Sequence, residues 1–305
     1  MDQAIQDFLR QVRESGRAAY WQGTPQEARA RPTLMQLVFG PAPQVARTEE
    51  LEFRSADGAR IGARLYVPGG SPRSLLVYFH GGGWVVGSVE GYHPFNADLA
   101  QRTGCAVLAV DYRLAPENAF PLPLQDAVAS LAFAADNASA WLGREPEALI
   151  AFGDSAGGAL ATMAAAEHNR AGRRRVDLQV LVYPICDTRF DTGSYESYQE
   201  GYLLTRRDME WFWDLYCPDR GLRENAASPM RQDLANAPRA LVVTAGCDPL
   251  RDEGEAYAFR LRESGVPADL MRGDGLVHGF LSMVNRSASA ADLYARIVER
   301  IRAIA

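Results

Sequence analysis

Lysine is absent from this sequence, and all 32 basic residues among its 305 are arginine. This absence excludes several enzyme classes that need an amine or ammonium group. They are Schiff-base and pyridoxal-phosphate enzymes, P-loop nucleotide hydrolases, Ser-x-x-Lys acyl enzymes and protein kinases. Arginine does not replace lysine as a base, because its guanidinium group stays protonated at any working pH.

Histidine and cysteine are scarce, with four residues of each. The cysteines are widely spaced and form no Cys-x-x-Cys pair: Cys105, Cys186, Cys217 and Cys247. This spacing predicts reduced thiols in a cytoplasmic protein, without a disulfide framework or a metal site. The four histidines are the only side chains expected to shuttle a proton easily at neutral pH.

Long apolar runs are also missing. No stretch approaches 18 uninterrupted apolar residues, so we expect no membrane span, and the N-terminus lacks the pattern of a secretory signal. The formal net charge of -6 argues against nucleic acid, which favours a basic face. At 47% hydrophobic and 23% charged residues, the composition is typical of a globular protein.

The hydrophobic pattern predicts an α/β fold. The first forty residues have helical spacing, and residues 51–67 alternate around a turn at 56–58, which indicates an antiparallel hairpin. Short apolar runs then alternate with helix-length segments, at 75–79, 106–110, 149–152, 178–183 and 240–245. Runs that are apolar on both faces are typical of a parallel sheet covered by helices.

Ser155 is the candidate nucleophile. It lies in Gly153-Asp154-Ser155-Ala156-Gly157-Gly158, between an apolar run and a helix-like segment. A Gly-x-Ser-x-Gly turn between a strand and a helix predicts a nucleophile elbow, in which the small flanking residues avoid collisions. The start of the helix would favour negative charge developing at the serine.

A second motif, His80-Gly81-Gly82-Gly83-Trp84, follows the apolar run 75–79. Three glycines at the end of a strand can turn their backbone N–H groups toward one point, as an oxyanion hole requires. We expect Gly82 and Gly83 to be the main donors, Gly81 to contribute to the hole and its turn, and the N–H of Ala156 to complete the set.

The candidate base follows by elimination. His80 belongs to the glycine motif, His93 precedes a proline at the start of a helix, and His168 lies too far along the helix after Ser155. His278 remains, in a loop after the last expected strand, where α/β sheets carry catalytic residues.

Two carboxylates compete to orient this histidine. Asp248 directly follows the run 240–245, whereas Asp252 stands three residues before Glu255 and has a capping role available. We favour Asp248, and the order Ser155, Asp248, His278 is that of α/β-hydrolases.

Together these motifs resemble the hormone-sensitive-lipase family of α/β-hydrolases, in its bacterial carboxylesterase branch, over about residues 50 to 300. The resemblance is carried by 80–84, 111–117, 153–158, 248–254 and 278–280. It implies a core of 46–185 and 239–305, with a helical cap made from 1–45 and the insertion 186–238. It also implies no cofactor, a possible homodimer through the last strand near Ala268–Arg272, and a supporting role for 111–117, where Arg113 and Glu117 could pair.

The insertion contains an aromatic cluster that includes Trp211 and Trp213. With Trp84, these tryptophans are our candidates for contacting substrate. The alternative is a helix that packs its aromatic residues against the core.

The sequence therefore predicts a serine carboxylesterase that acts on small-molecule esters of short to medium acyl chains through an acyl-enzyme. An amidase, a deacetylase or a lactonase could use the same triad. A ligand-binding receptor on the same scaffold is the alternative outside the enzymes, and it is disfavoured because Ser155, Asp248 and His278 are all present.

Overall fold

A single eight-stranded sheet organises the computed structural model, which describes all residues 1–305. The strand order is β1-β2-β4-β3-β5-β6-β7-β8, with β1 and β2 antiparallel and β3 to β8 mutually parallel. The strands are β1 Arg47–Arg54, β2 Arg60–Val67, β3 Leu75–Phe79, β4 Ala106–Asp111, β5 Leu149–Asp154, β6 Leu178–Val182, β7 Arg239–Cys247 and β8 Ala268–Val277. The predicted hairpin and the predicted parallel strands are confirmed. β8 forms one edge of the sheet, and its pairing with a second copy stays a prediction.

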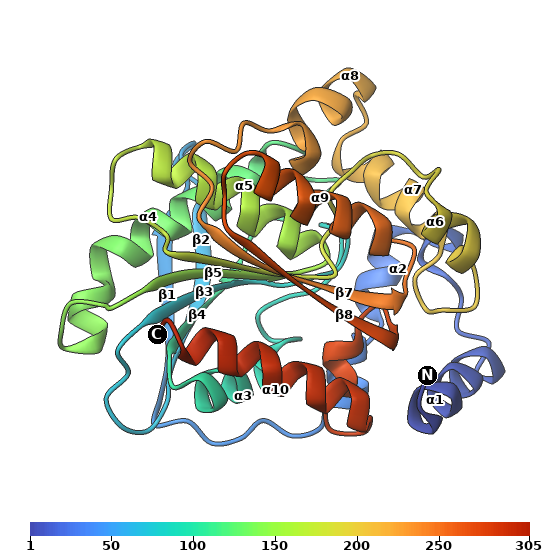
Figure 1. Ribbon diagram of the computed structural model, residues 1–305, viewed down its shortest axis with the longest axis horizontal. Coiled ribbons are helices and arrows are strands. Elements are labelled where there is room, and N and C mark those ends of the chain that lie inside the picture. The colour runs from blue at the N-terminus through green and yellow to red at the C-terminus, as the bar shows by residue number, and fades with distance from the viewer.

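Helices cover both faces of the sheet (Figure 1). α4 Leu122–Leu142, α5 Ala156–Arg170 and α9 Arg251–Glu263 lie on one face, and α3 His93–Thr103 and α10 Ala288–Arg302 lie on the other. Every residue of β3, β5 and β6 is buried. The solid apolar character of these strands follows from burial on both sides.

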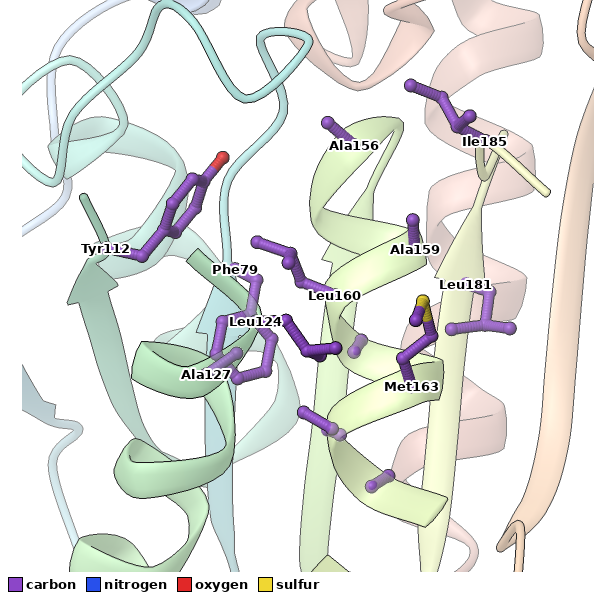
Figure 2. Close-up of a cluster of buried hydrophobic side chains, with 14 of the residues drawn as sticks. Phe79, Tyr112, Leu124, Ala127, Ala156, Ala159, Leu160, Met163, Leu181 and Ile185 are labelled. Carbon is purple, nitrogen blue, oxygen red and sulfur yellow. The ribbon is translucent and has the colours of Figure 1, made fainter. Parts of the chain in front are cut away.

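Buried side chains pack α5 against the strands beneath it. Figure 2 shows Leu160 and Met163 of α5 pointing toward Phe79 and Leu181 of the strands. All four side chains are buried. The small residues at the start of this helix, such as Ala159, let its backbone lie close to the sheet.

Two segments lie outside this layered core. The N-terminal segment holds α1 Gln3–Glu14, η1 Tyr20–Gln22, α2 Pro25–Ala30 and η2 Met35–Phe39. The segment between β6 and β7 holds α6 Gly193–Tyr198, α7 Arg206–Tyr216, α8 Arg220–Leu222, η3 Arg223–Ala227 and η4 Pro229–Arg231. Figure 1 shows α2, α6 and α7 near the end of the sheet toward which the arrows of β7 and β8 point.

The two outer segments contact each other directly. The backbone N–H of Trp21 donates to Asp208 Oδ1 at 3.2 Å, and the rings of Tyr20 and Phe212 lie 5.2 Å apart.

No helix in the structure has both the length and the apolar character needed to cross a lipid bilayer.

Candidate active site

Ser155 stands at the turn between β5 and α5, with φ 55° and ψ −119°. Positive φ at a serine is a strained conformation that the surrounding structure must hold. Glycines make this turn possible. A Cβ added to Gly153 would overlap the carbonyl of Gly157, and one added to Gly157 would overlap the carbonyl of Phe79. The elbow thus projects Ser155 from the end of the sheet, at the N-terminus of α5.

Asp248, His278 and Ser155 form one hydrogen-bonded line. His278 Nδ1 lies 2.8 Å from Asp248 Oδ2, and His278 Nε2 lies 3.0 Å from Ser155 Oγ. An ionised carboxylate only accepts hydrogen bonds, so Nδ1 carries the proton and Nε2 is free to accept one from the serine. Asp248 is fully buried, and its other oxygen accepts the backbone N–H of Leu250 at 2.9 Å. Three elements from distant parts of the sequence thus converge in one arrangement.

Asp252 does not reach His278. Its Oδ2 accepts the backbone N–H of Ser194 at 2.7 Å, and its Oδ1 pairs with Arg251. It joins the start of α9 to α6, which differs from the capping box predicted with Glu255.

Three backbone N–H groups at this site have no acceptor in the protein. They belong to Gly82, Gly83 and Ala156. Gly83 and Ala156 are buried and Gly82 is half-buried. Buried N–H groups are almost always paired, so three donors without an acceptor beside Ser155 are free to bind a group held there. Gly82 and Gly83 have φ of 125° and 60°, which favours glycine at both. A Cβ at Gly83 would also overlap the ring of Phe212.

Gly81 differs from its two neighbours. Its N–H donates to Asp154 Oδ1 at 2.8 Å, so it is not available to an oxyanion. The same carboxyl oxygen accepts the hydroxyl of Tyr78 at 2.5 Å. Burial raises the pKa of Asp154 to about 6, although the two hydrogen bonds oppose the shift. Gly81 thus anchors the loop, and Asp154 is an anchoring group that our reading of the sequence did not identify.

The other histidines lie outside the hydrogen-bonded line. The ring of His80 stacks on Tyr112, with centroids 4.4 Å apart, and its carbonyl accepts the hydroxyl of Tyr112 at 2.7 Å. Burial lowers the pKa of His80, which favours its neutral form. His93 lies 3.1 Å from the hydroxyl of Tyr66, and His168 Nε2 lies 2.8 Å from the carbonyl of Arg174.

A cavity of about 110 Å³ opens onto Ser155 and His278. Its polar end holds these residues and the glycine loop, and its remaining wall is mostly apolar. The apolar lining comes from the N-terminal segment, the loop after β3 and the insertion: Tyr20, Leu34, Met35, Val86, Tyr92, Tyr183, Leu203, Leu204, Met209 and Phe212. Linear sequence gave no signal for Tyr20, Leu34 or Met35, because only the folded chain brings them to the nucleophile.

The tryptophans proposed to contact substrate do not line this cavity. Trp84 is fully buried, with its ring stacked 4.0 Å from that of Tyr216, and Trp213 packs 4.8 Å from Trp84. Trp211 lies edge-on to Phe212. Along α7, Met209 and Phe212 face the cavity, so Trp213 is rotated by one residue into the core.

The suggested pair of Arg113 and Glu117 is wrong. Arg113 makes bonds of 2.9 and 2.6 Å to the buried Asp126, and one of 2.7 Å to Asp57. Glu117 instead pairs with Arg29 of α2 at 2.7 Å. Asp126 lies in α4, a full element away in the sequence, so spacing within the motif could not reveal it.

Comparisons with known proteins show which proteins this chain is similar to. A family model described as alpha/beta hydrolase fold matches residues 76–282. An ethyl acetate hydrolase of Pseudomonas putida is 36% identical over 276 residues, which cover 87% of this chain and 86% of that protein. An arylesterase of Saccharolobus solfataricus is 33% identical over 307 residues, which cover 99% of this chain and 99% of that protein.

Solved structures extend the similarity to the whole molecule. The hyperthermophilic esterase of the archaeon Pyrobaculum calidifontis superposes with a TM-score of 0.91 at 34% identity, covering 100% of this chain and 99% of that one. A thermostable esterase from Pseudomonas putida gives a TM-score of 0.91 at 30% identity, covering 99% and 97%. The similarity therefore includes the N-terminal segment and the insertion as well as the sheet.

Proposed function

The chain belongs to the hormone-sensitive-lipase family of α/β-hydrolases and is a carboxylic ester hydrolase, and from this premise we propose that Ser155, His278 and Asp248 are its catalytic triad. The membership confirms the fold class and the enzyme class that the sequence predicted. The proposal for the triad rests on one observation, the continuous line from Asp248 through His278 to Ser155 with distances of 2.8 and 3.0 Å.

In this mechanism His278 Nε2 takes the proton of Ser155 Oγ as the oxygen attacks the ester carbonyl. Asp248 holds the imidazole in one tautomer and stabilises its charged form. The protonated His278 then gives its proton to the departing alcohol, which leaves an acyl-enzyme on Ser155. The same nitrogen then takes a proton from a water molecule, which attacks the acyl carbon. The bond between that carbon and Ser155 Oγ breaks, His278 returns the proton to Oγ, and the carboxylic acid leaves.

The N–H groups of Gly82, Gly83 and Ala156 bind the oxyanion in this proposal. Their lack of any acceptor in the protein supports the assignment, since each would gain its hydrogen bond as the carbonyl becomes tetrahedral. Gly81 and Asp154 act beneath them, because the bond between Gly81 N–H and Asp154 holds the loop against β5.

The substrates we propose are esters of short to medium acyl chains. A cavity of about 110 Å³ with a mostly apolar wall favours a small acyl group over a long one. One similar protein is named as an ethyl acetate hydrolase, and the acyl group of ethyl acetate has two carbons. The segments 1–45 and 186–238 form the cap over this cavity, since both contribute to its wall.

The test combines a substrate panel with one substitution. We expect hydrolysis of p-nitrophenyl esters to be fastest at short chains within a series from two to sixteen carbons. Ser155→Ala should lower kcat by about 10⁴- to 10⁶-fold, because attack and proton transfer are both lost. A fluorophosphonate should label the wild-type protein at Ser155 and not the variant. Near-full activity in Ser155→Ala would refute the triad.

A further inference from the structure

A second cavity of about 220 Å³ lies beside the catalytic one, between α1 and the insertion. Figure 1 shows α1 set apart from the helices that cover the sheet. The wall of this cavity is formed by the N-terminal segment, including Leu9, Val12, Arg13 and Arg17, and by the insertion, including Leu203 and Asp208. The proposed triad does not use this space.

The two cavities share part of their walls. Tyr20, Leu34 and Leu203 line both of them, so only single side chains separate the two spaces. Leu203 has φ 76°, which is uncommon for a leucine and fixes where its side chain points. A substrate seated on Ser155 would therefore reach the second cavity by displacing one of these three side chains.

Arginine gives the second cavity a positive character. Arg13 and Arg17 line it, and neither is within ion-pair distance of a carboxylate. The guanidinium of Arg17 donates to the carbonyl of Pro32 at 3.1 Å. Arg31 stands behind the wall, bonded at 2.8 Å to the carbonyl of Ala18. Each guanidinium carries five N–H donors, so most of the donors in this cluster are unused within the protein.

Asp208 is the one acidic residue of the wall, and its oxygens are occupied. Oδ2 accepts the N–H and the hydroxyl of Thr205, at 3.1 and 2.7 Å, and Oδ1 accepts the N–H of Trp21. Burial raises the pKa of Asp208 above its ordinary value. Because both of its oxygens are bonded to Thr205 and Trp21, Asp208 makes no ion pair with Arg13 or Arg17.

We propose that this cavity binds an anionic group, a carboxylate, at the far end of an ester whose carbonyl is attacked by Ser155. The inference rests on the proposed function and names a substrate class for it, namely half-esters of dicarboxylic acids. Arginine suits this ligand because its planar donors match both oxygens of a carboxylate. The apolar side chains of Leu9, Val12, Leu34 and Leu203 would contact the methylene chain between the two ends.

The experiment compares pairs of esters that differ only in the remote charge. The monoethyl esters of succinic, adipic, suberic and sebacic acid are compared with the ethyl esters of the matching monoamides, which keep size and polarity without the charge. We expect kcat/KM to favour the half-ester by roughly tenfold at one chain length, because one charge-assisted pair is gained. The preference should shrink at high salt, since the arginines are partly exposed.

Substitutions assign this preference to the cavity. Arg13→Gln/Arg17→Gln should bring the ratio of half-ester to amide ester close to one. Arg10→Gln, on the same helix but paired with Asp7 and outside the cavity, should keep the wild-type ratio. Free adipate should inhibit hydrolysis of p-nitrophenyl acetate competitively in the wild type and several-fold less well in the double variant.

The outcomes separate this inference from the proposed function. If kcat/KM is the same for the half-ester and the matching amide ester at every chain length, the anion site is overturned. The proposed esterase activity is then unaffected. An unchanged preference for the half-ester in Arg13→Gln/Arg17→Gln would also overturn the anion site, because other residues would then bind the remote carboxylate. If the wild type hydrolyses neither p-nitrophenyl acetate nor any member of the series, the proposed function fails and the anion site fails with it.

Discussion

Asp248 and Asp252 stand four residues apart in the sequence but have different hydrogen-bond partners. Asp248 is buried against His278, whereas Asp252 bonds to Ser194 and Arg251 at the start of α9. We expect Asp248→Asn to lower kcat by about 10⁴-fold, because an amide in that place favours the wrong imidazole tautomer. Asp252→Asn should change kcat by less than about tenfold, since it weakens a contact with the insertion. Steady-state kinetics with p-nitrophenyl acetate measures both values.

A larger loss of kcat in Asp252→Asn than in Asp248→Asn would contradict the assignment. Circular dichroism on both variants serves as the control for folding. The pair of variants is well matched, because both replace a carboxylate by an amide in the short segment from the end of β7 to the first turn of α9.

Asp154 makes stability depend on pH in a predictable direction. Burial raises its pKa from 3.8 to about 6, so the folded protein holds this proton more tightly than the unfolded chain. Below pH 3.8 both states are protonated and no penalty arises. The penalty grows as the pH rises toward 6 and is then constant, at about 3 kcal/mol for a shift of this size.

Asp154→Asn removes this titration while keeping an oxygen for Tyr78 and Gly81. The melting temperature of the variant, minus that of the wild type, should therefore be higher at pH 7 than at pH 4.5. Thermal unfolding followed by circular dichroism at several pH values measures the difference. A difference independent of pH would show that Asp154 has no raised pKa in the folded protein.

At the scale of elements, α2 is fastened to the oxyanion loop by one side chain. Arg29 Nε donates to the carbonyl of Val85 at 2.7 Å, and Nη2 donates to the carbonyl of Ala115 at 2.6 Å. Two further bonds reach Glu117. Val85 in turn donates its N–H to the carbonyl of Gly82 at 3.1 Å. Arg29 is therefore a positioning residue for the loop.

We expect Arg29→Ala to lower kcat about tenfold. Without Arg29, the N–H groups of Gly82 and Gly83 would no longer be held where they bind the oxyanion. Glu117→Gln should have a smaller effect, since Glu117 is half exposed and the carbonyl contacts remain. Guanidinium at millimolar concentration should restore part of the activity to Arg29→Ala. Arg206→Ala, which breaks an exposed pair with Glu210 on α7, is the control. An unchanged kcat in Arg29→Ala would remove Arg29 from the positioning of the loop.

The elements differ in how well the sequence predicted them. Strands such as β3 and β5 were predictable because burial on both faces demands an unbroken apolar run. The orientation of α7 was not, because Phe212 and Trp213 are equally apolar and only packing decides which one faces the cavity. A cluster of aromatic residues thus predicts a buried helix without predicting its rotation.

The candidate site also contains residues that the sequence predicted and residues that it did not. The triad candidates were predictable because each stands in a local motif at the end of a strand, where α/β sheets carry their chemistry. Tyr20 and Leu34 were not predictable, since their contact with the cavity depends on how the N-terminal segment crosses the molecule. The partner of Arg113 was missed for the same reason, because Asp126 lies in another element.

For the whole molecule, the absence of lysine shapes the response to alkali. Guanidinium groups keep their charge at high pH, so ion pairs such as Arg113–Asp126 do not weaken by losing a proton. Tyrosine is then the main group whose ionisation opposes folding. Nine of the twelve tyrosines are buried: Tyr66, Tyr78, Tyr92, Tyr112, Tyr183, Tyr195, Tyr216, Tyr257 and Tyr294.

Burial raises the pKa of each of these nine phenols above the ordinary value of 10.0, for Tyr66 to about 12. The folded state therefore keeps protons that the unfolded chain loses, and stability is lost as the pH rises above 10. The loss is about 1.4 kcal/mol for each tyrosine and each pH unit, so nine of them offset a typical folding free energy near pH 11.

We expect one cooperative unfolding transition between about pH 10 and 12. Absorbance at 295 nm, which reports tyrosinate, and circular dichroism should change together there, because the buried phenols ionise only when the chain unfolds. Replacing Tyr294→Phe should shift the midpoint upward, since that hydroxyl is buried without a hydrogen-bond partner. Gradual ionisation of all twelve tyrosines in a still-folded protein would contradict the prediction.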